Sequence, residues 1–322
     1  MAPTVLSLAE LVAPVFLVIG IGYIIRRMGW LTAEADASLM RVIVNLLFPC
    51  LILDTILGNR ALEKAGNVLL APAVGFGTVV LGLGLSYWTA PVFGIRDDRQ
   101  RRTFALTCGL YNYGYVPLPL IQKLFDSQTT AVLFIHNVGV EIALWTAGVG
   151  LIMGAGRAKA DGSSVFKRIL SPPVLAIVAA MGLHFAGARY WLPSIGLSAI
   201  HNMGSAAIPL GLILTGATFA DQMKNLKVAN GAALSGASVL LRLGVIPLVM
   251  LVIARYLPCP EELRRILVIQ SAMPSAVIPV LLSKHYGGDA GAAMRIVLIT
   301  SALSLITIPI WIQFGLWWTQ RG

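Results

Sequence analysis

The chain has 322 residues, of which 57% are hydrophobic and only 12% are charged, and its mean hydropathy is +0.82. A soluble domain carries about a quarter charged residues, and an outer-membrane barrel alternates apolar and polar residues along short strands, so neither class fits the long apolar runs of this chain. The composition therefore predicts an all-α polytopic membrane protein. We read the net charge of +10 as a signal of membrane orientation rather than of a nucleic-acid partner.

Charged residues divide the chain into apolar segments close to the roughly 20 residues that a helix needs to cross a bilayer. Ten such transmembrane helices are predicted, and the three cysteines show neither a disulfide framework nor metal-ligand spacing. The predicted spans cover residues 9–25, 42–57, 67–90, 103–122, 129–153, 172–188, 198–220, 229–254, 264–284 and 290–318.

The Lys and Arg residues near the ends of these spans predict the orientation. With the N-terminus outside, fifteen of them fall on the inner side and eight on the outer side. Because basic loops stay in the cytoplasm, we expect a multi-pass protein of the cell (cytoplasmic) membrane with its N- and C-termini outside.

A basic linker separates the ten spans into five and five. It covers residues 154–171 and includes the stretch GAGRAKADGSSVFKR. An odd number of spans per half inserts the second half upside down, so residues 1–153 and 172–322 are predicted to be two inverted repeats. This arrangement is found in many secondary transporters.

The fourth and ninth spans carry residues that ordinary membrane helices avoid: YNYGYVPLPL at 111–120 and IQSAMPSAVIPVLL at 269–282. Proline removes a backbone donor and breaks the helix, and freed backbone groups must face protein or a water-filled cavity. Both helices are therefore predicted to break near mid-membrane and to cross there around a shared cavity. The alternative is that the prolines only kink the helices and shape their packing.

The residues at the two breaks are the predicted substrate-binding groups. Free amides and positive half-helix ends near Pro117 and Pro274 would compensate a bound anion. The candidate substrate-binding residues are Asn112, Tyr113, Pro117, Gln270, Pro274, Ser275 and, on the second span, Asn45. For Asn45, a plain interhelical hydrogen bond is the alternative.

Two ionisable residues lie near the centres of their spans, where an unpaired charge costs at least ~2.5 kcal/mol. Glu141 and Arg242 are therefore candidates for a buried ion pair between the fifth and eighth spans. The functional alternatives are that Arg242 holds a substrate carboxylate or that Glu141 binds a coupling proton. His136 is a further candidate proton carrier, with a packing histidine as the alternative.

Several stretches resemble the auxin efflux carrier family, specifically its short bacterial members. They are NLLFPCLIL at 45–53, NYGYVPLPL at 112–120, SAAIPLGLILTGATFA at 205–220 and QSAMPSAVIPVLLSKHYGGDAGAA at 270–293. The match spans nearly the whole chain in the family's order.

The resemblance implies the ten-helix architecture of the bile-acid/sodium symporters. Helices 1, 2, 6 and 7 would form a scaffold that usually dimerises, and helices 3–5 and 8–10 a moving core around the crossover of helices 4 and 9. Plant relatives export the auxin anion, and bacterial relatives are linked with malonate and malate. This chain lacks the long central hydrophilic loop of some plant members, so the substrate's identity does not carry over.

These observations predict a homodimeric secondary transporter that moves a small organic anion across the bilayer by elevator-type alternating access. We expect no cofactor, metal, catalytic residue or nucleic-acid partner, because the sequence contains neither a P-loop nor HExxH. The alternatives are a non-transporting sensor or scaffold and a sodium-coupled organic-anion symporter. Sodium dependence is not expected, because the fourth and ninth spans contain no Asp or Glu.

Overall fold

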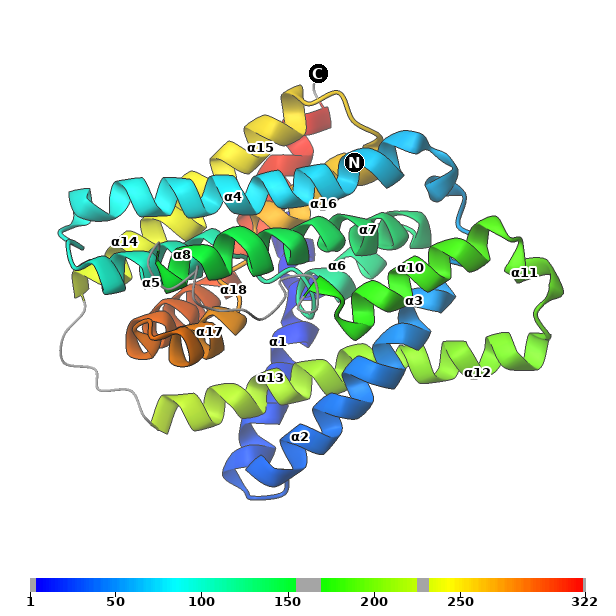
Figure 1. Ribbon diagram of the computed structural model, residues 1–322, viewed down its shortest axis with the longest axis horizontal. Helices are drawn as coiled ribbons and strands as arrows, with labels where there is room; N and C mark the ends of the chain where they lie inside the picture. Colours follow the sequence, from blue (N-terminus) through cyan, green and yellow to red (C-terminus); the bar gives the residue numbers. More distant parts are fainter. Residues whose placement is uncertain (1–3, 155–168, 225–231, 321–322) are drawn as a thin grey trace.

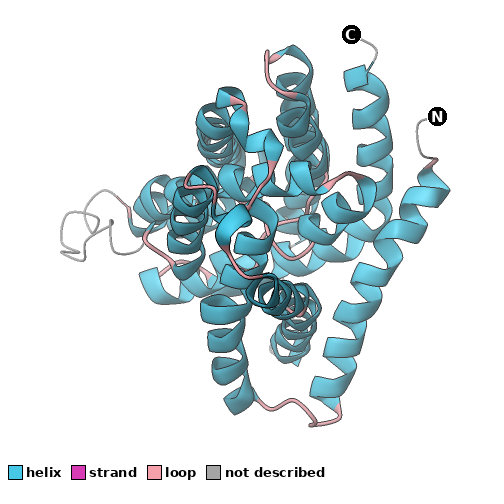
Figure 2. Ribbon diagram, turned by 90° about the vertical axis from the view of Figure 1, so that its right-hand side faces the viewer, coloured by secondary structure: helices cyan, strands magenta, loops and turns pink. Residues whose placement is uncertain are grey.

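The computed structural model describes residues 4–154, 169–224 and 232–320, and within these ranges every regular element is a helix (Figures 1 and 2). Seven of the described helices are long and apolar enough to cross a membrane, and α10 (Pro172–Phe185) is apolar but shorter. The seven cover Val5–Arg27, Ala33–Ile56, Gly66–Phe93, Ser127–Met153, Ser194–Met223, Ala233–Tyr256 and Ala290–Gln320. The all-helical class is confirmed, whereas ten spanning helices and their inverted relation stay predictions.

Four of the long helices contain one π-helical turn each. Pro49, Pro72 and Pro247 lie two residues after the end of three of these turns. A proline cannot donate to the carbonyl four residues earlier and its ring crowds that carbonyl, so a widened turn relieves the contact. The segments are α2 (Ala33–Val42), η1 (Ile43–Leu47) and α3 (Phe48–Ile56); η3 (Gly66–Leu70), α4 (Ala71–Thr89) and the 3₁₀ turn η4 (Ala90–Phe93); α7 (Ser127–Ala143), η5 (Leu144–Gly148) and α8 (Val149–Met153); and α14 (Ala232–Leu240), η6 (Leu241–Val245) and α15 (Ile246–Tyr256).

The fourth and ninth predicted spans are each made of two short helices. The fourth consists of α5 (Asp98–Gly109) and α6 (Pro117–Leu124), and the ninth of α16 (Glu261–Ser271) and α17 (Ile278–Tyr286). Proline lies in the first turn of both α6 and α17, where its missing donor is tolerated. None of the four helices alone has the roughly 20 residues that a membrane helix needs.

The closest helix contacts depend on glycine. α1 (Val5–Arg27) packs against α13 (Ala207–Lys224), and α4 packs against α7. A Cβ on Gly216 would lie 1.9 Å from the carbonyl oxygen of Ile19, and one on Gly139 would lie 1.8 Å from that of Pro72. Small residues therefore let these backbones approach each other.

The predicted scaffold and core correspond to two sets of helices, and their separation into two bodies stays a prediction. The scaffold group comprises α1 to α3 and α10 to α13, in which α3 packs against α10 and α12 (Ser194–Ser205), and α11 (Ala188–Trp191) follows α10. The core group comprises α4 to α8 and α14 to α18 (Ala290–Gln320), in which α16 packs against α7, α15 and α18. The 3₁₀ turn η2 (Arg60–Glu63) contacts α7, and α1 contacts α18 across the two groups. Movement of one group against the other stays a prediction.

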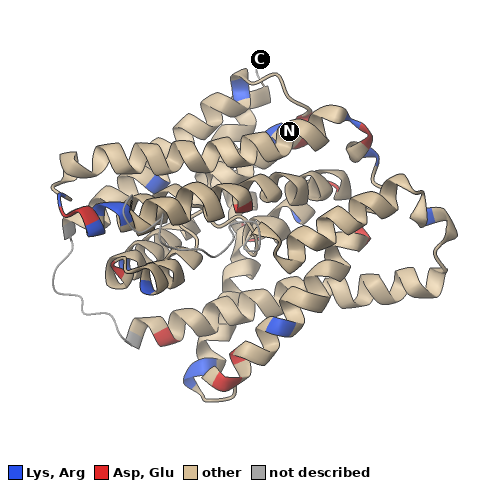
Figure 3. Ribbon diagram, viewed as in Figure 1, with Lys and Arg blue, Asp and Glu red and all other residues tan. Residues whose placement is uncertain are grey.

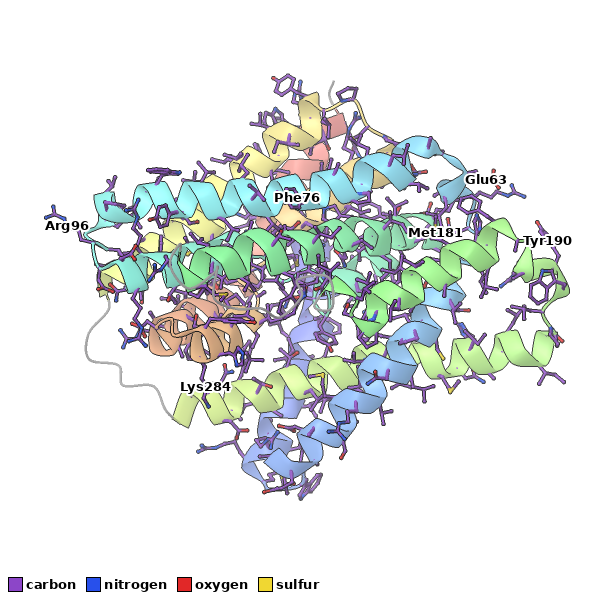
Figure 4. The ribbon with its side chains drawn as sticks, in the orientation of Figure 1. Glu63, Phe76, Arg96, Met181, Tyr190 and Lys284 are labelled. Atoms are coloured by element: carbon purple, nitrogen blue, oxygen red, sulfur yellow. The ribbon has the colours of Figure 1, made fainter. Side chains whose placement is uncertain are left out.

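Charged residues lie mostly near helix ends and leave long uncharged stretches between them (Figure 3). Arg96 and Tyr190 extend outward at opposite ends of the molecule (Figure 4). Residues 155–168, most of the predicted basic linker, and residues 225–231, where the eighth predicted span begins, lie outside the described ranges. The orientation of the termini and the division into halves at the linker therefore stay predictions.

Candidate functional site

The two helix breaks meet and bond to each other. The backbone N–H of Asn112 donates to the carbonyl of Pro274 at 2.8 Å, and the N–H of Ala276 donates to the carbonyl of Leu110 at 3.0 Å. The residues between these two bonds face each other as an antiparallel pair. Each break thus satisfies part of the other's free backbone, as the interior of a membrane protein requires.

Tyr113 joins the first break to its surroundings. Its carbonyl accepts hydrogen bonds from Nδ2 of Asn137 at 2.8 Å and from Nε2 of Gln270 at 3.5 Å. Its hydroxyl donates to Oε1 of Glu141 at 2.8 Å, and Nε1 of Trp145 donates to Oε2 of Glu141 at 2.9 Å. Asn137, Glu141 and Trp145 are spaced four residues apart, which places them along one side of the helix. Both oxygens of Glu141 therefore accept from neutral donors.

A cavity of about 830 Å³ adjoins this break, between the scaffold group and the core group. Its wall comes from α2, η1, α3, α10 and α13 on one side, and from residues 112–115, α6, α7 and residues 276–281 on the other. Most lining residues are apolar. The polar lining residues are Asp36, Asn112, Tyr113, Tyr115, Asn137, Glu141, Thr215, Thr218 and Gln222. No Lys, Arg or His is found among the lining residues in the described ranges.

Tyr115 reaches from the break to the scaffold group. Its ring packs edge-on against Phe48, with 5.5 Å between the ring centroids and 78° between the planes. A Cβ on Gly211 would lie 1.9 Å from Cε1 of Tyr115. The tyrosine ring therefore occupies the space that the glycine leaves open, and it joins the two helix groups at the cavity.

Asn112, Tyr113 and Glu141 are the sequence-predicted site residues that line the cavity. The other predicted residues of the two breaks are buried beside it: Pro117, Gln270, Pro274 and Ser275. Gln270 reaches the site only through the carbonyl of Tyr113. The structure thus brings the predicted residues of the two breaks together, while substrate contact by any of them stays a proposal.

Asn45 does not line the cavity. It is exposed, and its Nδ2 donates to the carbonyl of Arg41 at 2.8 Å, one turn earlier in the same helix. Its neighbours Val44 and Phe48 face the cavity instead. The suggestion that Asn45 lines the scaffold side of the cavity is therefore wrong.

Glu141 and Arg242 do not form an ion pair, although their similar depth in the membrane had suggested one. Arg242 is fully buried, and its Nη2 donates to the carbonyl of Ser271 at 3.2 Å. Its guanidinium lies 5.5 Å from the centroid of the Tyr111 ring. Because Arg242 does not line the cavity, it cannot hold a substrate carboxylate there by direct contact.

His136 is also buried and does not line the cavity. Its Nδ1 lies 3.4 Å from Oδ1 of Asn137, and its ring centroid lies 6.5 Å from that of Tyr111. This placement fits a packing histidine better than a group that exchanges protons with the cavity.

Six of the polar lining residues are not among the predicted site residues. They are Asp36, Tyr115, Asn137, Thr215, Thr218 and Gln222. A usable signal was present in the last three, because positions 215, 218 and 222 repeat at helical spacing on one face of α13. Asp36 gave no such signal, because it lies in the first turn of a helix and resembles a loop charge.

Comparison with known proteins agrees with a membrane transport function. A family described as membrane transport protein, related to the auxin efflux carriers, matches residues 7–312. The chain belongs to this family. An uncharacterized transporter of Methanothermobacter thermautotrophicus is 26% identical to this membrane transport protein over 305 residues, which cover 94% of this chain and 96% of the relative. An uncharacterized transporter of Methanocaldococcus jannaschii is 24% identical over 307 residues, which cover 94% and 97%.

Family membership and the apolar helices together confirm the resemblance to the auxin efflux carriers and identify the chain as a multi-pass membrane protein. In the described parts of the chain, no three His, Cys, Asp or Glu side chains gather closely enough to hold a metal ion. The cavity beside the two breaks is the candidate functional site.

Proposed function

We propose that this membrane transport protein is a secondary transporter that moves a small organic anion across the cell membrane by elevator-type alternating access. The observation that carries the proposal is the cavity of about 830 Å³ between the scaffold and core groups, beside two broken helices. A site at such a boundary opens to one side of the membrane or the other when one group slides past its neighbour.

The groups at the break support an anionic substrate. The N-termini of α6 and α17 begin beside the cavity, which is lined by Val277 and Ile278 at the start of α17 and by Leu118 in the first turn of α6. Helix N-termini carry partial positive charge. In the first turn of α6, Pro117 and Pro119 have no N–H, and the N–H of Leu118 donates to the carbonyl of Gly114 at 3.1 Å, so the helix dipoles act here rather than free N–H groups. The dipoles stabilise an anion without a permanent cation that would hold the anion too tightly for release.

The apolar lining narrows the substrate class. Phe48, Tyr115, Phe134 and Leu133 surround the space next to the break, and burying apolar surface contributes to binding in proportion to its area. We therefore favour a carboxylic acid with an apolar body, closer to an auxin-like acid than to malonate or malate, whose polar groups would fill little of this lining.

The arrangement of the transporter follows from the same proposal. The core group carries Asn112, Tyr113, Asn137 and Glu141 at the site, and the scaffold group dimerises and stays fixed in the bilayer. Residues 1–153 and 172–322 are the inverted repeats, with both termini outside. Sodium is not required, because Glu141 is the one carboxylate in contact with the break among the described residues.

A flux measurement tests the proposal. The purified protein is reconstituted into lipid vesicles and offered a panel of radiolabelled mono- and dicarboxylates, with and without sodium. We expect saturable uptake of at least one acid in both conditions. Binding without flux would instead favour a sensor, and uptake that vanishes when choline replaces sodium would favour a sodium-coupled symporter.

Asn112→Ala tests the location of the site. If the amide contacts the bound anion, its loss weakens affinity by about 1.5–3 kcal/mol, or roughly ten- to a hundredfold. Asn45→Ala is the matched control, because Asn45 is exposed and outside the cavity. Both variants are checked for monodispersity. Normal affinity in folded Asn112→Ala protein would show that the Asn112 amide does not contact the substrate.

A further inference from the structure

The charged side chains that line the cavity are negative and would repel an anionic substrate. The cavity is lined by two carboxylates, Asp36 and Glu141, and in the described part of its wall by no basic side chain. Asp36 has a basic partner, because it forms an ion pair with Arg26, whose exposed fraction is only 6% and whose Nε also lies 3.6 Å from Oδ2 of Asp221. Glu141 is held by Tyr113 and Trp145, which are both neutral. Glu141 is therefore the carboxylate of the described cavity wall that has no basic partner.

Other ionisable groups near α7 do not change this result. The helices and turns packed against α7 are α3, α4, α6, α10, α16, η2, η3 and η5. Their ionisable side chains are Cys50, Asp54, Arg60, Glu63, Tyr87, Lys123, His184, Glu261, Glu262, Arg264 and Arg265. On α7 itself the other ionisable side chain is His136, and Asp36 and Tyr115 also line the cavity. Within the described ranges, none of these groups forms a hydrogen bond or ion pair with Glu141.

We propose that Glu141 binds a proton together with the substrate anion, so that the protein is a proton–anion symporter; the inference rests on the function proposed above. An ionised Glu141 repels a second carboxylate that enters the cavity, and this repulsion is strong where water is scarce. A proton on Glu141 removes the repulsion. It also converts an acceptor into a donor, because a protonated carboxyl carries one O–H.

The hydrogen bonds of Glu141 connect this proton to the anion site. Once Glu141 is protonated, its own O–H is available to a substrate carboxylate, and the hydroxyl of Tyr113 turns from Glu141 toward the anion because a hydroxyl hydrogen rotates freely. Tyr113 lies next to Asn112 in the break, so the anion, the hydroxyl and the carboxyl are within one site.

The proton and the anion travel on the same group of helices. Glu141 is on α7, and the break at residues 110–116 is followed by α6, which packs against α7 in the core group. Movement of this group therefore carries both ions without a proton relay through the scaffold. For a monocarboxylate the load is one negative and one positive charge. Uptake is then driven by the pH gradient and is indifferent to membrane voltage.

Calorimetry on the purified protein tests the inference. Phenylacetate and malonate serve as probes, and each is titrated in two buffers with different ionisation enthalpies, so that the difference reports the protons taken up. We expect wild-type protein to take up one proton per anion bound near neutral pH. Its affinity should fall about tenfold per pH unit as the pH rises, as linkage of one proton requires.

Glu141→Gln keeps the shape of the protonated side chain without exchanging a proton. It should bind the same probe with no proton uptake and with an affinity independent of pH, and in vesicles a pH gradient should no longer concentrate the probe. Asp54→Asn is the matched control, because Asp54 is on α3, bonds His201 at 2.9 Å and does not line the cavity. This control should take up one proton as wild type does. Glu141→Asp should retain proton uptake, and it serves if the Gln variant does not fold.

The outcomes separate the two proposals. Failure of wild-type protein to bind either probe at any pH contradicts the proposed function. Binding without proton uptake, or proton uptake that persists in Glu141→Gln, leaves the transport function standing and overturns the symport inference, since the proton would then lie elsewhere or on the substrate itself.

Discussion

The two sides of the crossover treat a buried charge in opposite ways. On the cavity side, Glu141 is partly exposed and each of its oxygens accepts one hydrogen bond. On the far side, Arg242 is fully buried and donates to Ser271, while its Nε and Nη1 find no hydrogen-bond partner among the described residues. The crossover therefore separates two environments: the ionisable group on one side lines the cavity, and the one on the other side is packed among the helices.

The position of Arg242 has a clear structural logic. It donates to the carbonyl of Ser271, the last residue of α16, where a cation is favoured by the helix dipole. Its guanidinium also faces the ring of Tyr111, a contact that adds cation–π attraction. Arg242 therefore stabilises one of the half-helix ends from which the crossover is built.

The largest expected effect is that of Arg242→Ala. The truncation leaves a void in a fully buried position, and comparable truncations of large core side chains cost about 2–5 kcal/mol. We expect a clear drop in the thermal unfolding midpoint in detergent. Arg242→Met, which fills most of the volume without the charge, should recover much of the loss. A folded Arg242→Met protein that no longer binds the anion would break the comparison, because the charge would then act through the crossover.

Gly211→Ala should have the next largest effect. The new Cβ would lie 1.9 Å from the ring of Tyr115, and overpacking of this kind costs about 1–3 kcal/mol. We expect roughly tenfold slower uptake, because the variant displaces the side chain that joins the two groups at the cavity. The control is Gly77→Ala on α4, where a Cβ meets nothing within 4 Å. Equal uptake by the two variants would show that Tyr115 does not matter to movement.

Asn137→Ala should have a smaller effect on affinity. It removes the 2.8 Å hydrogen bond to the carbonyl of Tyr113, and one such bond contributes about 1 kcal/mol, or roughly fivefold in affinity. Gln270→Ala removes the longer contact of 3.5 Å to the same carbonyl and should change affinity less. Equilibrium binding of a transported acid ranks the two variants, and the reverse order would mean that Gln270 contacts the substrate itself.

The smallest expected effect concerns Glu262, a carboxylate that, unlike Glu141, is paired with a cation. Lys64 Nζ lies 2.6 Å from Oε1 of Glu262, and Asn67 Nδ2 lies 3.3 Å from Oε2. Burial acts to raise the pKa of Glu262, but the hydrogen bond from Lys64 and the further bonds from its own backbone and from Asn67 outweigh it, so the pKa lies below its usual value.

Because the pKa of Glu262 is lowered in the folded protein, its stabilising contribution is present at neutral pH and is lost as the pH falls through the folded value. Glu262→Gln should therefore lower stability by at most about 1 kcal/mol at neutral pH, with the difference from wild type shrinking on acidification. Unfolding midpoints of wild type and variant, measured at neutral and at acidic pH, give this difference in stability. A difference that grows on acidification would contradict the pairing.

The all-helical class and the two helix breaks were predictable from the sequence, because both depend on local signals, whereas ten spanning helices stay a prediction. Long apolar runs specify membrane helices, and the prolines at 117 and 279 specify where α6 and α17 begin. The equal depth of the two breaks predicted that they would meet. The structure shows this contact as hydrogen bonds between residues 110–112 and 274–276. Tyr115 was visible in the same motif, yet its contact with Gly211 depends on the packing of α13, which no local signal reports.

The misplaced residues share a cause. Counting from loop charges estimates the depth of a residue, but not the side of the helix on which it lies. Asn45 and Arg242 both lie inside π-helical turns, η1 and η6. Such a turn adds a residue to the helix and rotates the next turns relative to a regular α-helix. Because the sequence does not distinguish a proline preceded by a π turn from one that kinks a helix, the faces of these residues were not predictable.

The hydrogen bond between Trp145 and Glu141 has an optical consequence. The indole N–H lies 2.9 Å from the carboxylate oxygen, so the fluorophore is in direct contact with the charge that is proposed to come and go. Indole emission responds to the electric field at the ring, and the six other tryptophans supply a background that Trp145→Phe subtracts. The protein thus carries its own spectroscopic reporter of the charge state of Glu141, readable in unlabelled protein during a pH jump and before any substrate is known.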